Sequence, residues 1–113
     1  MNAVFFKNWT NQARKGLLEL TILNDIRNRR MYGYEIQRKF RKSKGLLISE
    51  GTIYNILRRL KQQRLVKTIQ TKSPDGPKRK YYQLTELGSQ TLAQMNGYWK
   101  AIKQQADSIE QGK

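Results

Sequence analysis

The segment GTIYNILRRLKQQRLV, residues 51–66, constrains the fold more than any other part of the chain. Its apolar residues recur at the i, i+3, i+4, i+7 spacing of an amphipathic helix. They are Ile53, Ile56, Leu57 and Leu60. The opposite face carries hydrogen-bonding side chains: Thr52, Asn55, Arg58, Arg59 and Gln62, with Tyr54 at the border. These groups suit the reading of nucleic acid, although an ordinary solvated helix face would have a similar composition.

The chain is strongly basic for its length. Its 113 residues, enough for one domain, include 23 Lys plus Arg against 8 Asp plus Glu, a formal net charge of +15. The pI is about 10.4. A charge excess of this size favours a polyanionic partner.

The residue types that most enzymes and metal sites use are missing. The chain has no Cys and no His, and its carboxylates are scattered without a paired-acid cluster. We therefore expect no enzyme activity, no metal and no other cofactor. No stretch resembles a cleavable signal sequence or approaches the ~20 apolar residues of a membrane helix, so we expect a cytoplasmic protein.

A core helix is predicted over residues 11–28, where Leu18, Ile22 and Ile26 lie on one broad apolar face. The apolar segment before it contains Phe5, Phe6 and Trp9. We expect these rings to be buried against this core or a partner's, in preference to forming a ligand-binding aromatic cluster.

A second, short helix is indicated by Ile36 and Phe40, which follow a break at Gly33. Gly45 is expected to end it. Ser49 is then a suitable N-cap for the third helix, which we expect to begin near Glu50.

A β-hairpin is predicted after the third helix. Residues 65–71 and 79–85 both alternate close to period two, and the intervening KSPDGPK is turn chemistry. The tip is cationic, with Lys72, Lys78, Arg79 and Lys80. Tyr81 and Tyr82 should point to opposite faces of the strand, with at least one of them buried. Three helices followed by a hairpin predict a winged helix-turn-helix unit.

The last part of the chain is predicted to be one helix, about 40 Å long at ~1.5 Å per residue. Its apolar residues step by three and four, as in the seam of a coiled coil, and they are Leu92, Met95, Trp99, Ile102, Ala106 and Ile109. The fold class is therefore mainly α with a small β-hairpin wing. We expect a winged helix-turn-helix DNA-binding domain over residues 1–84 and a C-terminal dimerisation helix over residues 85–113.

The excess charge lies entirely in the first of these two parts. Residues 1–84 hold 20 basic and 5 acidic side chains, whereas residues 85–113 hold 3 of each. A DNA-binding unit joined to a protein–protein interface would divide in this way. Duplex DNA is favoured over RNA because a projecting polar helix fits the major groove of B-DNA and not the narrow one of A-form RNA.

Five motifs follow one another along the chain. They are RKGLLELTIL in the first helix, YGYEI at 32–36, GTIYNILRRL at 51–60, RLV entering the wing and GPKRKYYQLTELG at 76–88. In this order and spacing the sequence resembles the PadR family of transcriptional regulators over nearly its whole length. The single helix after the wing resembles the family's smaller branch.

The resemblance implies a homodimer on a palindromic operator, with the C-terminal helix packed against the partner, often against its N-terminal helix. Carried over residue by residue, it implies DNA contacts at Thr52, Tyr54, Asn55 and Arg58 and, in the wing, at Lys78, Arg79 and Lys80. Gly51 fits a close approach of the backbone to DNA, or equally the relief of crowding against the second helix. Tyr34 is expected to pack rather than to touch phosphate.

The resemblance also suggests a ligand site, because some similar family members bind planar aromatic compounds between protomers through a tryptophan on the last helix. Trp99 stands at the matching position, with Met95 and Ile102 on the same seam. A packed dimer seam without a ligand explains the same residues and is the preferred interpretation.

The resulting hypothesis is a dimeric repressor in which Asn55 reads adenine and Arg58 reads guanine, each pair worth roughly 1–3 kcal/mol of discrimination. Phosphates would be neutralised by the wing cations and by Arg59, Lys61, Lys39 and Lys42. The alternatives are an architectural or partition DNA-binding protein of plasmid or phage type, and a protein-interaction module for an acidic partner. Binding to an anionic membrane is disfavoured because the apolar faces are taken by the core and the dimer seam.

Overall fold

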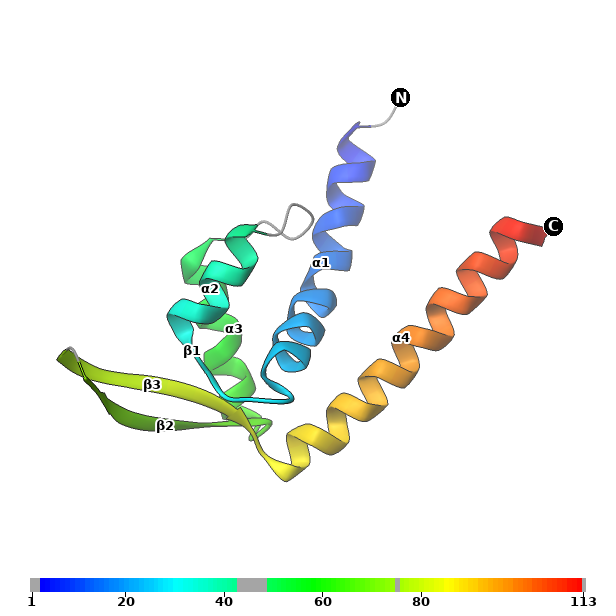
Figure 1. The fold of residues 1–113 in the computed structure, drawn as a ribbon. Helices are drawn as coiled ribbons and strands as arrows, with labels where there is room; N and C mark the ends of the chain where they lie inside the picture. Colours follow the sequence, from blue (N-terminus) through cyan, green and yellow to red (C-terminus); the bar gives the residue numbers. More distant parts are fainter. Residues whose placement is uncertain (1–2, 43–48, 75, 113) are drawn as a thin grey trace.

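The computed structural model describes residues 3–42, 49–74 and 76–112. The elements are α1 (Ala3–Ile26), β1 (Met31–Tyr32), α2 (Gly33–Lys42), α3 (Glu50–Gln62), β2 (Val66–Ser73), β3 (Gly76–Leu84) and α4 (Glu86–Gly112). Figure 1 shows α1, α2 and α3 gathered together, with the β2–β3 hairpin projecting to one side and α4 to the other. The expected fold class, mainly α with a hairpin wing, is confirmed.

The core lies where the apolar stripes of the first three helices meet. Ile53 and Leu57 of α3 are buried with Ile22 of α1 and Ile36 of α2. Ile56 packs at the edge of this cluster. The stripe predicted from residues 51–66 is therefore the inner face of α3, and its polar face points outward.

The sheet contains one strand more than predicted. β1 pairs with β3, so the strand order is β1-β3-β2, and Tyr32 lies opposite Tyr81. Two residues leave no detectable pattern in a sequence, which explains why β1 was missed. Tyr82 is buried and Tyr81 is half-buried, as the alternation along the strand predicted.

The first helix is longer than predicted, because it begins at Ala3 and not near residue 11. Phe5, Phe6 and Trp9 stand on this extension with 66%, 65% and 56% of their surfaces exposed. Their predicted burial against this chain's own core is wrong, because the extension runs beyond the other helices. Burial against a partner stays a prediction. Gly45, predicted to end α2, lies outside the described residues.

The start of α4 is held tightly against the end of α3. The Thr85 hydroxyl accepts a hydrogen bond from the Gly88 N–H at 2.9 Å, capping α4, and donates one to the Arg64 carbonyl at 2.7 Å. The Thr85 N–H also donates to the Leu65 carbonyl at 3.1 Å. These bonds join the long helix to the connection between α3 and β2.

Helices α1 and α4 meet near the hairpin and then diverge (Figure 1). The amides of Asn24 and Asn96 exchange two hydrogen bonds of 3.0 Å, which join the helices. The radius of gyration is 16.4 Å, whereas a compact domain of this length has about 13 Å. The molecule is therefore elongated, with two helical arms that leave the core.

The predicted seam of α4 is divided between the chain's core and its surface. Leu92 is buried and Met95 is half-buried, but Trp99 and Ile102 are about two-fifths exposed, at 41% and 42%. In the described parts of the chain, we find no helix that combines the length and apolar character needed to cross a bilayer.

Candidate nucleic-acid interface

The outer face of α3 is exposed along its length. Thr52, Asn55 and Arg58 point away from the core because Ile53 and Leu57 occupy the inner face. Arg58 Nη1 donates a hydrogen bond of 2.8 Å to Asn55 Oδ1. The two candidate base-reading side chains are thus in contact with each other.

The start of α3 is capped as predicted. Ser49 Oγ accepts a hydrogen bond of 3.2 Å from the Thr52 N–H and lies 2.9 Å from Thr52 Oγ1. A Cβ added at Gly51 would meet no atom within 4 Å. Relief of crowding against α2 therefore does not explain this glycine, and close approach to DNA stays a prediction.

Tyr54 is half-buried at the border of this face, against the first residue of α2. A Cβ at Gly33 would lie 2.7 Å from Tyr54 Cε1, so a larger residue at this position would require the ring to move. Tyr54 also influences the pKa of the Tyr82 phenol. The pKa of the Tyr82 phenol is raised above 10.0, mainly by burial, then by Tyr54, while Arg58 acts in the opposite direction.

Two of the predicted phosphate contacts are ion-paired. Arg59 Nη1 lies 3.2 Å from Glu19 Oε2, and Lys39 Nζ lies 2.8 Å from Asp25 Oδ1. Both cations are largely exposed, and such surface pairs are worth only about 0–1 kcal/mol, so a phosphate could compete for them. The side chain of Lys42 is outside the described set.

The wing cations divide between the two sides of β3. Lys78 and Lys80 are exposed, whereas Arg79 is half-buried, with its guanidinium carbon 4.6 Å from the centre of the Tyr32 ring. The alternation of strand side chains accounts for this division. Arg79 therefore also holds the hairpin against β1.

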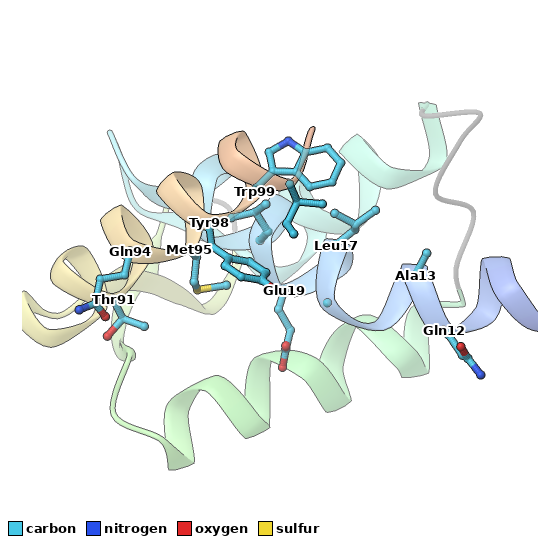
Figure 2. A pocket seen from close by; sticks show the side chains of 12 residues that line it. Gln12, Ala13, Leu17, Glu19, Thr91, Gln94, Met95, Tyr98 and Trp99 are labelled. Atoms are coloured by element: carbon cyan, nitrogen blue, oxygen red, sulfur yellow. The ribbon is translucent and has the colours of Figure 1, made fainter. Parts of the chain in front are cut away.

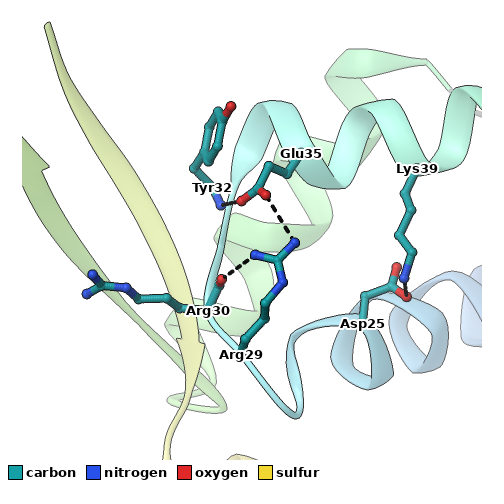
Figure 3. A network of polar contacts seen from close by, with 6 residues as sticks. All are labelled: Asp25, Arg29, Arg30, Tyr32, Glu35 and Lys39. Carbon is teal, nitrogen blue, oxygen red and sulfur yellow. Dashed lines mark hydrogen bonds and ion pairs between the residues drawn. The ribbon is translucent and has the colours of Figure 1, made fainter. Parts of the chain in front are cut away.

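Figure 3 shows the polar contacts around the connection between α1 and α2. Glu35 Oε1 accepts a hydrogen bond of 3.1 Å from the Tyr32 N–H, which caps the start of α2, and Glu35 Oε2 pairs with Arg29 at 3.1 Å. Asp25 and Lys39 join α1 to α2 beside this pair. These contacts orient α2 relative to the core.

The structure shows a set of contacts between arginines and tyrosine rings that was not predicted from the sequence. Arg38 and Arg41 lie 5.9 and 5.4 Å from the Tyr34 ring, and Arg30 lies 4.8 Å from the Tyr81 ring. The helical spacing of Tyr34, Arg38 and Arg41 was a visible signal. The contact between Arg30 and Tyr81 depends on the unpredicted pairing of β1 with β3.

A groove of about 550 Å³ separates the diverging arms of α1 and α4. Figure 2 shows it lined by side chains of both helices, including Leu17, Met95, Tyr98 and Trp99. Ile102 also lines it. The three seam residues singled out from the sequence, Met95, Trp99 and Ile102, are thus brought to one groove.

The three-helix unit, the exposed polar face of α3 and the adjoining cationic hairpin define a winged helix-turn-helix DNA-binding protein. Comparison with known proteins then identifies the family. The model of the PadR-like family of transcriptional regulators matches residues 22–94. The chain belongs to this family, whose members are regulators of transcription and not enzymes.

Relatives support this assignment over most of the chain. A PadR-like transcriptional regulator from Bacillus cereus is 35% identical, with a TM-score of 0.81 over 90% of this chain and 99% of the other. A Streptococcus transcriptional regulator is 32% identical, with a TM-score of 0.79 over 88% and 97%. An uncharacterized protein X of Lysinibacillus sphaericus is 32% identical over 87% of this chain and 92% of its own.

Proposed function

We propose that the protein is a homodimeric, sequence-specific repressor that binds a palindromic operator in duplex DNA. The observation that carries this proposal is the outer face of α3, where Asn55 and Arg58 are exposed beside the cationic hairpin. The net charge of +15 supports a polyanionic partner. Repression is the simplest consequence of a dimer that occupies a promoter.

In the proposed complex, α3 enters the major groove. Arg58 donates two hydrogen bonds to a guanine and Asn55 pairs with an adenine. Thr52 and Tyr54 lie at the rim of the same face and contact the backbone. The remaining proposed phosphate contacts are Lys39, Lys42, Arg59, Lys78, Arg79 and Lys80.

The two arms supply the proposed dimer interface. Phe6 and Trp9 on α1 and Trp99 and Ile102 on α4 expose apolar surface that a second copy would cover. A two-fold dimer of this kind presents two α3 helices to half-sites about 34–36 Å apart, one turn of B-DNA. The division of the chain into a DNA-binding part, residues 1–84, and a dimerisation helix, residues 85–113, is part of this proposal.

The deciding experiment selects bound duplexes from a random library at physiological salt and footprints the preferred sequence. A single palindrome with half-sites one helical turn apart is expected. Diffuse enrichment with spreading along DNA would instead favour an architectural or partition role. No enrichment would favour a module that binds an acidic protein. Repression itself is tested by placing the selected operator before a reporter gene.

If Arg58 reads a base and Lys80 contacts a phosphate, substitutions of these two residues should affect DNA binding in different ways. Arg58→Ala should lose about 1–3 kcal/mol of preference at one base pair of each half-site. Lys80→Ala should weaken all duplexes alike and flatten the salt dependence. Titration of the selected operator and a set of single-base variants separates the two effects. An unchanged preference in Arg58→Ala, with lower overall affinity, would remove Arg58 from the base-reading role.

The groove between the arms favours a second, additional role, which is the binding of a small planar aromatic effector. Its volume of about 550 Å³ and its apolar lining fit such a ligand. In a Trp9→Phe background, Trp99 is the only indole, so its fluorescence reports on ligands in the groove. Saturable quenching by planar aromatic compounds, with release of the operator, is expected. If the groove is instead filled by the packed seam of the dimer, these compounds should not quench the fluorescence of Trp99.

A further inference from the structure

The outward face of α2 carries an aromatic ring flanked by two arginines. Tyr34, Arg38 and Arg41 follow one another at i, i+4 and i+7, and we call them the Tyr34 face. The guanidinium carbons of Arg38 and Arg41 lie 5.9 and 5.4 Å from the ring centre. Tyr34 is 48% exposed, and both arginines are exposed.

The charge of the Tyr34 face is not neutralised within the described part of the chain. Neither Arg38 nor Arg41 forms an ion pair there, whereas Lys39 of the same helix is paired with Asp25. A tyrosine ring can hold a guanidinium in place without cancelling its positive charge. The outer N–H groups of such an arginine stay available for a bidentate contact with a phosphate.

The ring itself is held by the sheet. Tyr32 stacks on Tyr34 with ring centres 6.4 Å apart and meets Tyr81 edge-on at 5.5 Å. Arg79 covers Tyr32 at 4.6 Å. Side chains from α2, β1 and β3 therefore form one continuous stack. This stack helps to hold the Tyr34 ring in position.

The Tyr34 face begins next to the border of the proposed DNA-reading surface. Gly33, the residue before Tyr34, is in contact range of Tyr54 at the border of α3. Lys39, in contrast, faces α1 through Asp25 and is about 160° away from Arg41 around the helix. Arg41 therefore lies on the side of α2 that is turned away from this contact with α1.

We propose that the Tyr34 face binds the phosphate backbone next to the groove occupied by α3, with Arg38 and Arg41 as the contacting side chains and the Tyr34 ring as their platform. This proposal rests on the proposed function and deepens it. The contact is independent of base sequence, so it raises the affinity for the operator and for other duplexes by the same factor.

The test measures duplex affinity against salt concentration for the whole chain and for an Arg38→Gln/Arg41→Gln variant. Each phosphate contact contributes about 0.9 to the slope of log K against log salt concentration, so two lost contacts should reduce the slope by about 1.8 per protomer. The preferred base sequence should not change. Lys100→Gln is the control for the loss of a positive charge, because this exposed lysine lies on α4, outside the proposed DNA-binding part, and the slope it gives should equal the wild-type value.

The possible outcomes separate this proposal from the one it rests on. If the wild-type chain binds its operator tightly and the double variant keeps the full salt slope, the Tyr34 face does not contact phosphate, although the proposed function stands. If the wild-type chain shows no duplex binding, both proposals fail. Thermal unfolding of each variant shows that the fold is intact.

The role of the ring is tested by two substitutions at the same position. Tyr34→Phe keeps the platform and loses only the hydroxyl, so it should bind as the wild type does. Tyr34→Leu removes the platform and should weaken operator and random duplexes by the same factor. Equal losses in both variants would assign the effect to the hydroxyl and overturn the platform role.

Discussion

At the residue scale, the end of α3 contains a side chain in a conformation that suits glycine. Arg64 has a φ of 63°, in the left-handed region. Its N–H donates to the Lys61 carbonyl at 2.9 Å, and the Leu65 N–H donates to the Leu60 carbonyl at 3.0 Å. This pair of bonds is the Schellman motif, which terminates the helix and turns the chain into β2.

Arg64→Gly is therefore expected to stabilise the protein. A non-glycine residue in the left-handed region costs roughly 1–2 kcal/mol, and the greater freedom of glycine in the unfolded chain offsets part of the gain. A net increase of about 0.5–1 kcal/mol in the free energy of unfolding should appear in denaturant titration. A decrease would mean that the Arg64 side chain makes a stabilising contact larger than this strain.

At the scale of elements, the direction of α4 depends on how closely its first turn approaches the connection after α3. A Cβ at Gly88 would lie 2.0 Å from the Leu65 carbonyl oxygen, which also accepts the Thr85 N–H. This backbone contact cannot be relieved by a rotamer change. We expect Gly88→Ala to destabilise the fold by about 1–3 kcal/mol and to shift α4.

Gly97 provides the control on the same helix. A Cβ there would meet nothing within 4 Å, so Gly97→Ala should stabilise α4 by up to about 1 kcal/mol through helix propensity alone. Thermal unfolding of both variants measures the contrast. If Gly88→Ala is as stable as Gly97→Ala, the junction is more adaptable than its geometry indicates.

At the scale of the whole molecule, the two arms account for both the elongated shape and the exposed aromatic surface. Phe6 and Trp9 stack at 6.4 Å on an arm that has no core of its own. Sedimentation equilibrium should give twice the chain mass of 13.4 kDa. Phe6→Ser/Trp9→Ser should shift the equilibrium towards monomer, because burial of each ring contributes about 1.5–3 kcal/mol.

Loss of the dimer should weaken operator binding far more than binding to a single half-site, because two linked sites bind with a high effective concentration. Lys7→Gln, on the same arm, is the control and should remain dimeric. A double variant that stays dimeric with full operator affinity would exclude this arm from the interface.

Features encoded by neighbouring residues were predicted well from the sequence. The helical spacing of Ile53 and Leu57, the Ser49 cap and the pairing of two neighbouring strands in a hairpin are all local, and all are confirmed. The strands are longer than predicted, because β2 runs to Ser73 and β3 begins at Gly76, within the segment predicted as a turn. The distribution of charge along the chain was also evident from the sequence alone. The candidate base-reading side chains of α3 were predictable because burial of one helix face leaves the other exposed.

The contacts between distant parts of the chain were decided only by the tertiary structure. β1 exists because Met31 and Tyr32 meet a strand 50 residues further along, and only this pairing brings Tyr32 to Tyr81 and to Arg79. The exposure of the α1 arm also depends on the tertiary structure. Its aromatic residues predict that the arm is buried, but they do not reveal which surface would cover it. The sequence determined the helices and the two hairpin strands because those preferences act over a few residues. Contacts between residues that are distant in the sequence decided which faces pack together. The same contacts decided which cations are paired with a carboxylate and which are not.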